Sequence, residues 1–119
     1  MYRVPKDLDL SKINGSFTTQ ICIGPSDIQF SIRDVHFAIQ SKIMLMKNGK
    51  QVAVWEECDW PSSEFYNIMN VNVVSYNILN DREIVITFEN GYTMHLFDNS
   101  DHYESMQITI NGHDCLWVI

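Results

Sequence analysis

The sequence predicts a mainly β fold, either an antiparallel β-sandwich or an open half-barrel of about nine strands with one short helix. Apolar and polar residues alternate with a period of two in many segments, which is typical of strands with one face in a core. Other segments are rich in β-branched and aromatic residues. Asn-Gly pairs, a strong signal for tight hairpins, separate several of these segments.

The chain of 119 residues is expected to form one domain, residues 1–119, with a single hydrophobic core. Apolar residues make up 45% of it, enough to offset the conformational entropy lost on folding. Residues 1–9 are expected to form a loosely ordered N-terminal tail.

Nine segments are predicted to be strands. They are residues 17–23, 28–32, 35–47, 52–55, 71–79, 84–88, 94–96, 106–110 and 116–119. The long segment 35–47 is either continuous or interrupted by a bend. Type I′ turns, with positive φ at both central residues, are predicted at Asn48-Gly49, Asn90-Gly91 and Asn111-Gly112. Residues 24–27 and 80–81 mark two further turns by their composition.

The predicted helix lies between residues 59 and 70. Pro61 occupies a favourable first helical position, and Phe65, Ile68 and Met69 have the spacing that places side chains on one helical face. We expect two or three turns that pack these three side chains on the sheet. An irregular loop is the alternative.

A weak internal repeat links the two halves of the chain. Residues 28–34 (IQFSIRD) align with residues 84–90 (IVITFEN) at a separation of 56 positions. Two β units of similar construction are one interpretation. Chance similarity between antiparallel meanders is the other.

Charge is distributed unevenly along the chain, whose net charge is −7. Residues 1–50 carry seven Lys or Arg against four Asp, a net charge of +3, whereas residues 51–119 carry one base against eleven acids, a net charge of −10. Such a surface repels nucleic acid and anionic lipid and accelerates encounter with a basic partner. The simpler interpretation is that the acids keep a small protein in solution.

The expected location is the cytoplasm. No apolar run reaches the roughly 18 residues that a membrane-spanning helix needs, and charged residues occupy the place of a signal peptide's apolar core. The three cysteines are odd in number and widely spaced, which favours free thiols.

The sequence carries no recognisable catalytic or metal-binding motif, so we expect no enzyme, no cofactor and no metal. The four histidines lack partners at the spacing of zinc ligands, and the nearest acidic group, Asp98, Asp101 and His102, has no second histidine or cysteine close by. Neither a nucleophile elbow nor a glycine-rich phosphate loop is present.

Two stretches combine aromatic rings with carboxylates, as surfaces that bind basic proteins do. They are residues 55–60 (WEECDW) and residues 98–104 (DNSDHYE). The residues predicted to bind a partner are Trp55, Glu56, Glu57, Asp59, Trp60, Asp98, Asp101 and Glu104. The alternative is that the tryptophans belong to the core and the acids cap the helix or line loops.

Residues 70–110 resemble a group of small bacterial β domains. The resemblance rests on Phe88-Glu89-Asn90-Gly91, on Met94 and Leu96, and on Tyr103-Glu104-Ser105 followed by Ile108. Domains of this group are often encoded beside toxin genes and are similar to immunity proteins. The resemblance implies a toxin-neutralising role and supplies no catalytic residues.

These observations lead to the hypothesis of a cytoplasmic immunity protein, as in contact-dependent growth inhibition. It would bind a basic protein toxin, a nuclease, and occlude its active site, acting as a monomer or weak homodimer without contacting nucleic acid or membrane. The alternative function is a small-molecule-binding or accessory β domain, with a ligand held by Met44, Met46, Trp55 and Tyr66.

Overall fold

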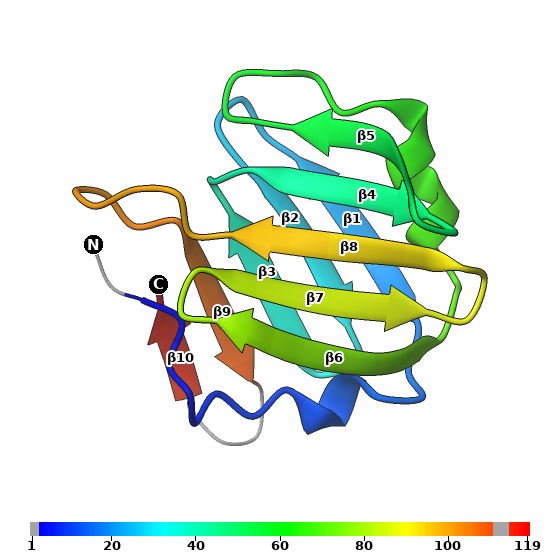
Figure 1. Cartoon of the computed structure of the whole chain (residues 1–119), viewed down its shortest axis with the longest axis horizontal. Helices are drawn as coiled ribbons and strands as arrows, with labels where there is room; N and C mark the ends of the chain where they lie inside the picture. Colours follow the sequence, from blue (N-terminus) through cyan, green and yellow to red (C-terminus); the bar gives the residue numbers. More distant parts are fainter. Residues whose placement is uncertain (1–2, 111–114) are drawn as a thin grey trace.

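The computed structural model describes residues 3–110 and 115–119, and over these residues the chain is a sandwich of two antiparallel sheets (Figure 1). The first sheet has the order β1-β2-β3-β9-β10 and the second the order β5-β4-β8-β7-β6. In chain order the strands are β1 (Thr18–Ile23), β2 (Ile28–Ile32), β3 (Val35–Ile39), β4 (Ile43–Lys47), β5 (Lys50–Trp55), β6 (Val73–Asn80), β7 (Glu83–Phe88), β8 (Tyr92–Phe97), β9 (Met106–Ile110) and β10 (Cys115–Val118). The prediction of an antiparallel sandwich is confirmed.

The described residues form ten strands rather than nine, because residues 35–47 form two strands instead of one. β3 ends at Ile39 and β4 begins at Ile43, and the two strands lie in different sheets. At the crossing, the Gln40 amide donates to the Ser105 carbonyl at 2.8 Å. Ser41, which separates the two strands, is only 6% exposed. The bend is therefore the point where the chain passes from one layer to the other.

The core lies between the sheets and is built by the predicted alternation. In β2 and β3 every second residue is buried, and Phe30 stacks on Phe37 with ring centroids 4.6 Å apart. Buried residues of both sheets belong to one hydrophobic cluster. In β1 the alternation shifts at a bulge after Thr18, so that Thr18 is buried and Phe17 is 47% exposed.

Both halves of the chain have the same strand topology. A three-stranded meander, β1-β2-β3, is followed by the hairpin β4-β5, and β6-β7-β8 is followed in the same way by β9-β10. Each hairpin pairs with the meander of the other half, β4 with β8 and β9 with β3. The sequence repeat thus corresponds to a repeated unit, and each sheet takes three strands from one half and two from the other.

Two of the backbone hydrogen bonds between the halves are related by a two-fold relation. The Gly15 amide donates to the Val73 carbonyl at 2.8 Å, and the Asn70 amide donates to the Thr18 carbonyl at 3.0 Å. The two donor residues are 55 positions apart in the sequence (70 − 15), and the two acceptor residues are separated by the same number of positions (73 − 18). Gly15 and Asn70 also share a left-handed backbone, with φ of 76° and 60°.

The predicted helix is shorter than expected. It is the 3-10 helix η2 (Ser63–Ile68), capped by Ser62, whose Oγ accepts a hydrogen bond from the Glu64 amide at 3.2 Å. Its buried residues are Phe65 and Ile68. Met69 is extended and only partly buried, because the chain there leaves the helix to pair with β1.

A second 3-10 helix, η1 (Ser11–Ile13), was not predicted. It packs beside β6 and buries Ile13. Among the residues that the structure describes, no helix has both the length and the apolar character needed to cross a membrane.

The predicted turns occur, with one difference in geometry. Asn48 and Gly49 both have positive φ, as a type I′ turn requires, whereas only Gly91 does in the second pair. The Asn90 side chain instead donates to the Asn67 carbonyl at 2.9 Å. Turns join β1 to β2 and β6 to β7 at the predicted positions. Asn111-Gly112 lies outside the described residues.

Residues 3–9 are packed against the sandwich rather than forming the loose tail that was expected. Val4 and Leu8 are 2% and 3% exposed and belong to the core cluster. The Val4 amide donates to the Asp81 carbonyl at 2.8 Å. This segment brings Arg3 to the end of the sandwich where the candidate site lies.

Gly15, the left-handed residue that corresponds to Asn70, offers a test of the two-fold relation. Replacing Gly15 by Ala should lower the free energy of unfolding by about 1–2 kcal/mol, since an added Cβ meets no atom within 4 Å and the cost is conformational. Gly15→Asn should cost less, because Asn70 already adopts this conformation in the other half. Urea denaturation measures both values, and equal losses for the two variants would contradict the equivalence.

Candidate functional site

The two acidic and aromatic stretches predicted from the sequence lie at the same end of the sandwich. A pocket of about 240 Å³ is lined by residues of the β3–β4 link, the β5–η2 loop and the β8–β9 loop, among them Ser41, Glu57 and Glu104. A neighbouring pocket of similar size is lined by Asp59 and Trp60 together with the β1–β2 turn. Stretches about 40 positions apart in the chain are therefore brought side by side.

Local hydrogen bonds shape the β5–η2 loop. The Asp59 amide donates to the Glu56 carbonyl at 3.0 Å, and Cys58 adopts a left-handed φ of 73°. The indole Nε1 of Trp55 donates to the Asp59 carbonyl at 2.9 Å, which fastens the loop to the core. Glu56, Glu57, Cys58 and Asp59 are left exposed.

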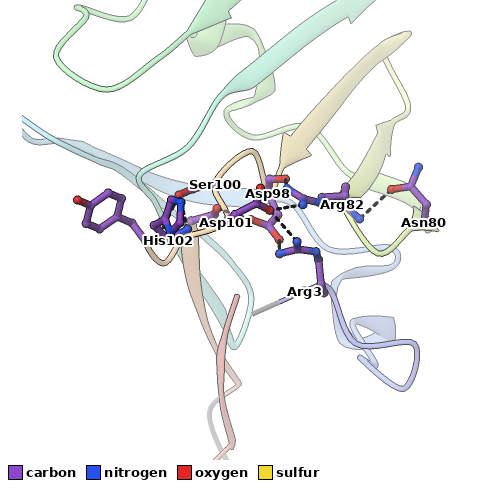
Figure 2. A network of polar contacts seen from close by, with 9 residues as sticks. Arg3, Asn80, Arg82, Asp98, Ser100, Asp101 and His102 are labelled. Atoms are coloured by element: carbon purple, nitrogen blue, oxygen red, sulfur yellow. Dashed lines mark hydrogen bonds and ion pairs between the residues drawn. The ribbon is translucent and has the colours of Figure 1, made fainter. Parts of the chain in front are cut away.

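The β8–β9 loop is shaped by Ser100. Its Oγ accepts hydrogen bonds from the amides of His102 and Tyr103 at 3.2 and 3.0 Å, so that residues 100–103 form a tight turn (Figure 2). The turn leaves Tyr103 77% exposed. Glu104 follows it and is partly buried.

Together these two loops form a surface that we call the acidic rim. Its residues are Glu56, Glu57, Asp59, Trp60, Tyr103 and Glu104. Trp60 is 87% exposed and, with Tyr103, is among the most exposed large apolar side chains that the structure describes. Tyr103 was missed as a site residue by the prediction, although its place beside Glu104 in an aromatic and acidic stretch was a usable signal.

Trp55 and Asp98 were predicted to bind a partner, but both side chains are buried. Trp55 is 1% exposed because it lies on the core face of β5, opposite Ile43 of β4. Asp98 is 2% exposed and accepts a hydrogen bond from Ser105 Oγ at 2.7 Å. Neither side chain is exposed for contact with a partner.

Asp101 is exposed, but its charge is engaged within the chain. Its Oδ1 accepts hydrogen bonds from Arg82 Nη2 and, at 2.7 Å, from Arg3 Nη2 (Figure 2). Arg3 Nη1 also lies 3.6 Å from Asp98 Oδ2, and Arg82 Nη1 donates to the Asp98 carbonyl at 3.2 Å. These contacts tie the N-terminal segment and the β6–β7 turn to the β8–β9 loop. We therefore assign Asp101 a structural role.

This network changes the acidity of Asp101. The hydrogen bond from Arg82, together with the positive charge of Arg82 and the contacts of Arg3, lowers the pKa of Asp101 below its usual value of 3.8. In return, the hydrogen bond to Asp101 is the main reason why the pKa of Arg82 is raised.

A pH series on Asp101→Asn tests this network. Because the pKa of Asp101 is lower in the folded protein, the ionised carboxylate stabilises the fold above the pKa of the unfolded chain. This contribution is lost as the pH falls through the pKa of the folded protein. The variant should be less stable than the wild type at pH 7, and the gap should close as the pH falls below about 4. Urea denaturation at several pH values measures this gap, with Glu89→Gln, an exposed acid outside the network, as control. A gap independent of pH would contradict the prediction.

The carboxylates of the acidic rim are not neutralised by neighbouring bases. In the part of the chain that the structure describes, no ion pair involves Glu56, Glu57, Asp59 or Glu104. Nearby, Arg82 pairs with Asp101, and Lys42 holds its Nζ 5.3 Å from the centroid of the Phe97 ring. The rim therefore presents uncompensated negative charge beside two exposed aromatic rings.

Two contacts, each between a hydroxyl group and an imidazole ring, lie away from the rim. Ser31 Oγ is 2.8 Å from His36 Nδ1, whose Nε2 is 3.0 Å from Gln29 Oε1. On the other sheet, His95 lies 2.7 Å from Glu83 and 3.2 Å from Thr93. Neither contact was predicted from the sequence, and the first is created by the pairing of Ser31 with His36 across the β2–β3 hairpin.

Such a contact is one element of nucleophile activation, which also needs free donors for an oxyanion. Both contacts lie on faces of paired strands, where strand pairing occupies the backbone amides.

Among the described residues, no group of three or more His, Cys, Asp or Glu side chains is placed to hold a metal.

The four residues proposed to hold a small molecule do not form one site. Met44 and Met46 are partly buried on the outer face of β4, whereas Trp55 faces the core. Tyr66 projects from η2 and is 57% exposed. Strand alternation places Met44 and Trp55 on opposite faces of the sheet, so a ligand held by all four is ruled out.

Comparison with known proteins gave no match: no protein-family model, no curated protein and no solved structure is significantly similar to this chain.

Proposed function

We propose that this chain is an immunity protein that binds a basic protein toxin, a nuclease, and neutralises it by covering its phosphate-binding site. The observation that carries the proposal is the acidic rim. Trp60 and Tyr103 are 87% and 77% exposed and stand beside carboxylates that no base of the described chain neutralises.

The chemistry of the rim matches that of a nuclease active site. A nuclease holds the phosphates of its substrate with Lys and Arg, and carboxylates are the natural complement of those side chains. Exposed carboxylates steer a basic protein toward the rim and speed its association. Large aromatic side chains such as Trp60 and Tyr103 supply apolar area that is buried on binding. Negative charge and exposed aromatic rings are thus gathered at one end of the sandwich. Such a surface is suited to covering an active-site cleft on a partner protein.

The anchoring of the rim also supports a role in binding. Trp55 Nε1 holds one loop, and the Arg3, Arg82 and Asp101 contacts hold the other. A rim whose backbone is held before binding loses less conformational entropy on association.

Co-expression with the neighbouring open reading frames tests this function. Affinity capture of the tagged chain should recover a basic polypeptide, and retention should weaken as salt rises. In a nuclease assay the chain should inhibit the captured polypeptide, and a DNA or RNA oligonucleotide should compete with the chain for it. Recovery of the chain alone, or full nuclease activity in its presence, would overturn the proposal.

A further inference from the structure

Two Asn-Gly turns lie side by side at one end of the second sheet (Figure 1). Asn48-Gly49 joins β4 to β5, and Asn90-Gly91 joins β7 to β8. The Asn48 amide donates to the Gly91 carbonyl at 3.1 Å, so the two turns are in contact. Both asparagines are exposed, and each precedes a glycine, whose backbone nitrogen no Cβ shields. Asparagine in this position is prone to deamidation.

Deamidation begins when the backbone nitrogen of the following residue attacks the side-chain carbonyl carbon of asparagine. The bond from this nitrogen to Cγ forms and the bond from Cγ to Nδ2 breaks. Ammonia leaves with the proton of the attacking nitrogen, and a succinimide ring remains. Water then adds to one of the two ring carbonyls and breaks its bond to nitrogen, which gives aspartate or isoaspartate. The reaction therefore needs a free attacking N–H and a carboxamide that can rotate toward it.

Hydrogen bonds oppose both requirements at Asn90. Its Nδ2 donates to the Asn67 carbonyl at 2.9 Å, and its Oδ1 accepts from the Tyr92 amide at 3.4 Å. The attacking nitrogen is also engaged, because the Gly91 amide donates to the Phe88 carbonyl at 3.3 Å. The carboxamide and the attacking nitrogen must leave these partners before the ring can form.

Asn48 lacks these restraints. In the part of the chain that the structure describes, neither its carboxamide nor the Gly49 amide forms a hydrogen bond. The Asn48 Oδ1 only packs beside Gly91, where an added Cβ would lie 2.6 Å away. A Cβ added at Gly49 meets no atom within 4 Å, so the space around the attacking residue is open. Lys47 and Lys50 are exposed on either side of the pair, and positive charge favours loss of the proton from the attacking nitrogen.

We propose that Asn48 is a site of spontaneous deamidation in the folded protein, whereas Asn90 is protected. One product places a carboxylate in the turn, and the other, isoaspartate, adds a methylene group to the backbone. Asn48 and Gly49 both have the positive φ of a type I′ turn, which a lengthened backbone does not match. Conversion should therefore loosen the β4–β5 hairpin. This inference is independent of the proposed function.

The test follows both asparagines by chymotryptic peptide mapping and mass spectrometry while the full chain is incubated at mildly alkaline pH. In the folded protein Asn48 should convert at least about tenfold faster than Asn90, because hydrogen bonds oppose the reaction only at Asn90. In urea the rate at Asn90 should rise toward that at Asn48, which controls for the difference in neighbouring residues. Endoproteinase Asp-N, which cuts before aspartate but not before isoaspartate, separates the two products.

Two variants test the effect on the hairpin. Urea denaturation before and after incubation should show a loss of stability in the wild type and in Asn90→Gln, but not in Asn48→Gln, because glutamine closes the corresponding larger ring far more slowly. Three outcomes would overturn the inference. They are equal rates at Asn48 and Asn90 in the folded protein, a rate at Asn90 that urea does not raise, and a loss of stability in Asn48→Gln as large as that of the wild type.

Discussion

Reversing two charges on the acidic rim, in Glu56→Lys/Glu57→Lys, should slow association with the proposed basic partner by roughly tenfold or more. Both side chains are exposed, and no base of the described chain pairs with them, so their charge is available for steering. The substitution replaces attraction by repulsion at the first point of approach. Stopped-flow association rates at low and high salt measure the effect, which should shrink as salt screens it.

The matched control places the same change of charge at the other end of the strands. Asp34 and Glu89 are exposed in the β2–β3 and β7–β8 turns, away from the rim. Asp34→Lys/Glu89→Lys alters the net charge equally but leaves the rim intact. If both double variants slow association to the same extent, only net charge matters and the rim is not the binding surface.

Trp55→Ala should be among the most destabilising single substitutions in this chain, lowering the free energy of unfolding by about 3–5 kcal/mol. Trp55 is 1% exposed and fills the core opposite Ile43, so truncation leaves a cavity. It also removes the bond from Nε1 to the Asp59 carbonyl. Urea denaturation gives the loss, and a value below about 1 kcal/mol would contradict the assigned packing.

Since small domains are stable by only about 5–15 kcal/mol, binding experiments need a variant milder than Trp55→Ala. Trp55→Phe keeps most of the apolar volume and removes the bond that fastens the β5–η2 loop. It should lose less stability than Trp55→Ala while still weakening partner binding, because the carboxylates of the rim are then less well held. Unchanged binding in a folded Trp55→Phe variant would show that this bond does not position the rim.

Much of the fold follows from local pattern. The alternation in residues 28–32 predicted a strand whose alternate residues are buried in the core, and this is what the structure shows. Asn48-Gly49 predicted a type I′ hairpin, and φ is positive at both residues. Both depend on near neighbours in the chain. For residues 35–47 the sequence left a continuous strand and a bend as alternatives, because the alternation continues on both sides of the bend at Ser41.

The candidate site was predictable as two stretches of sequence, but not residue by residue. Trp55 and Trp60 stand five positions apart in similar surroundings, yet one is 1% and the other 87% exposed. Asp98 is buried whereas Glu104 is only partly buried, because Ser105 and Arg3 hold Asp98 inside. Such differences depend on residues distant in sequence.

Composition and periodicity by themselves determined that the chain is an antiparallel β protein with acids and aromatic rings in two loops. Tertiary structure alone decided that the hairpin of each half joins the sheet of the other, so that the charges counted separately in the two halves are mixed in space. It also decided that the two loops meet around one pocket. The physical reason is that strand alternation is a local property, whereas the choice of strand partner, and hence of neighbouring loops, is set by packing between distant segments.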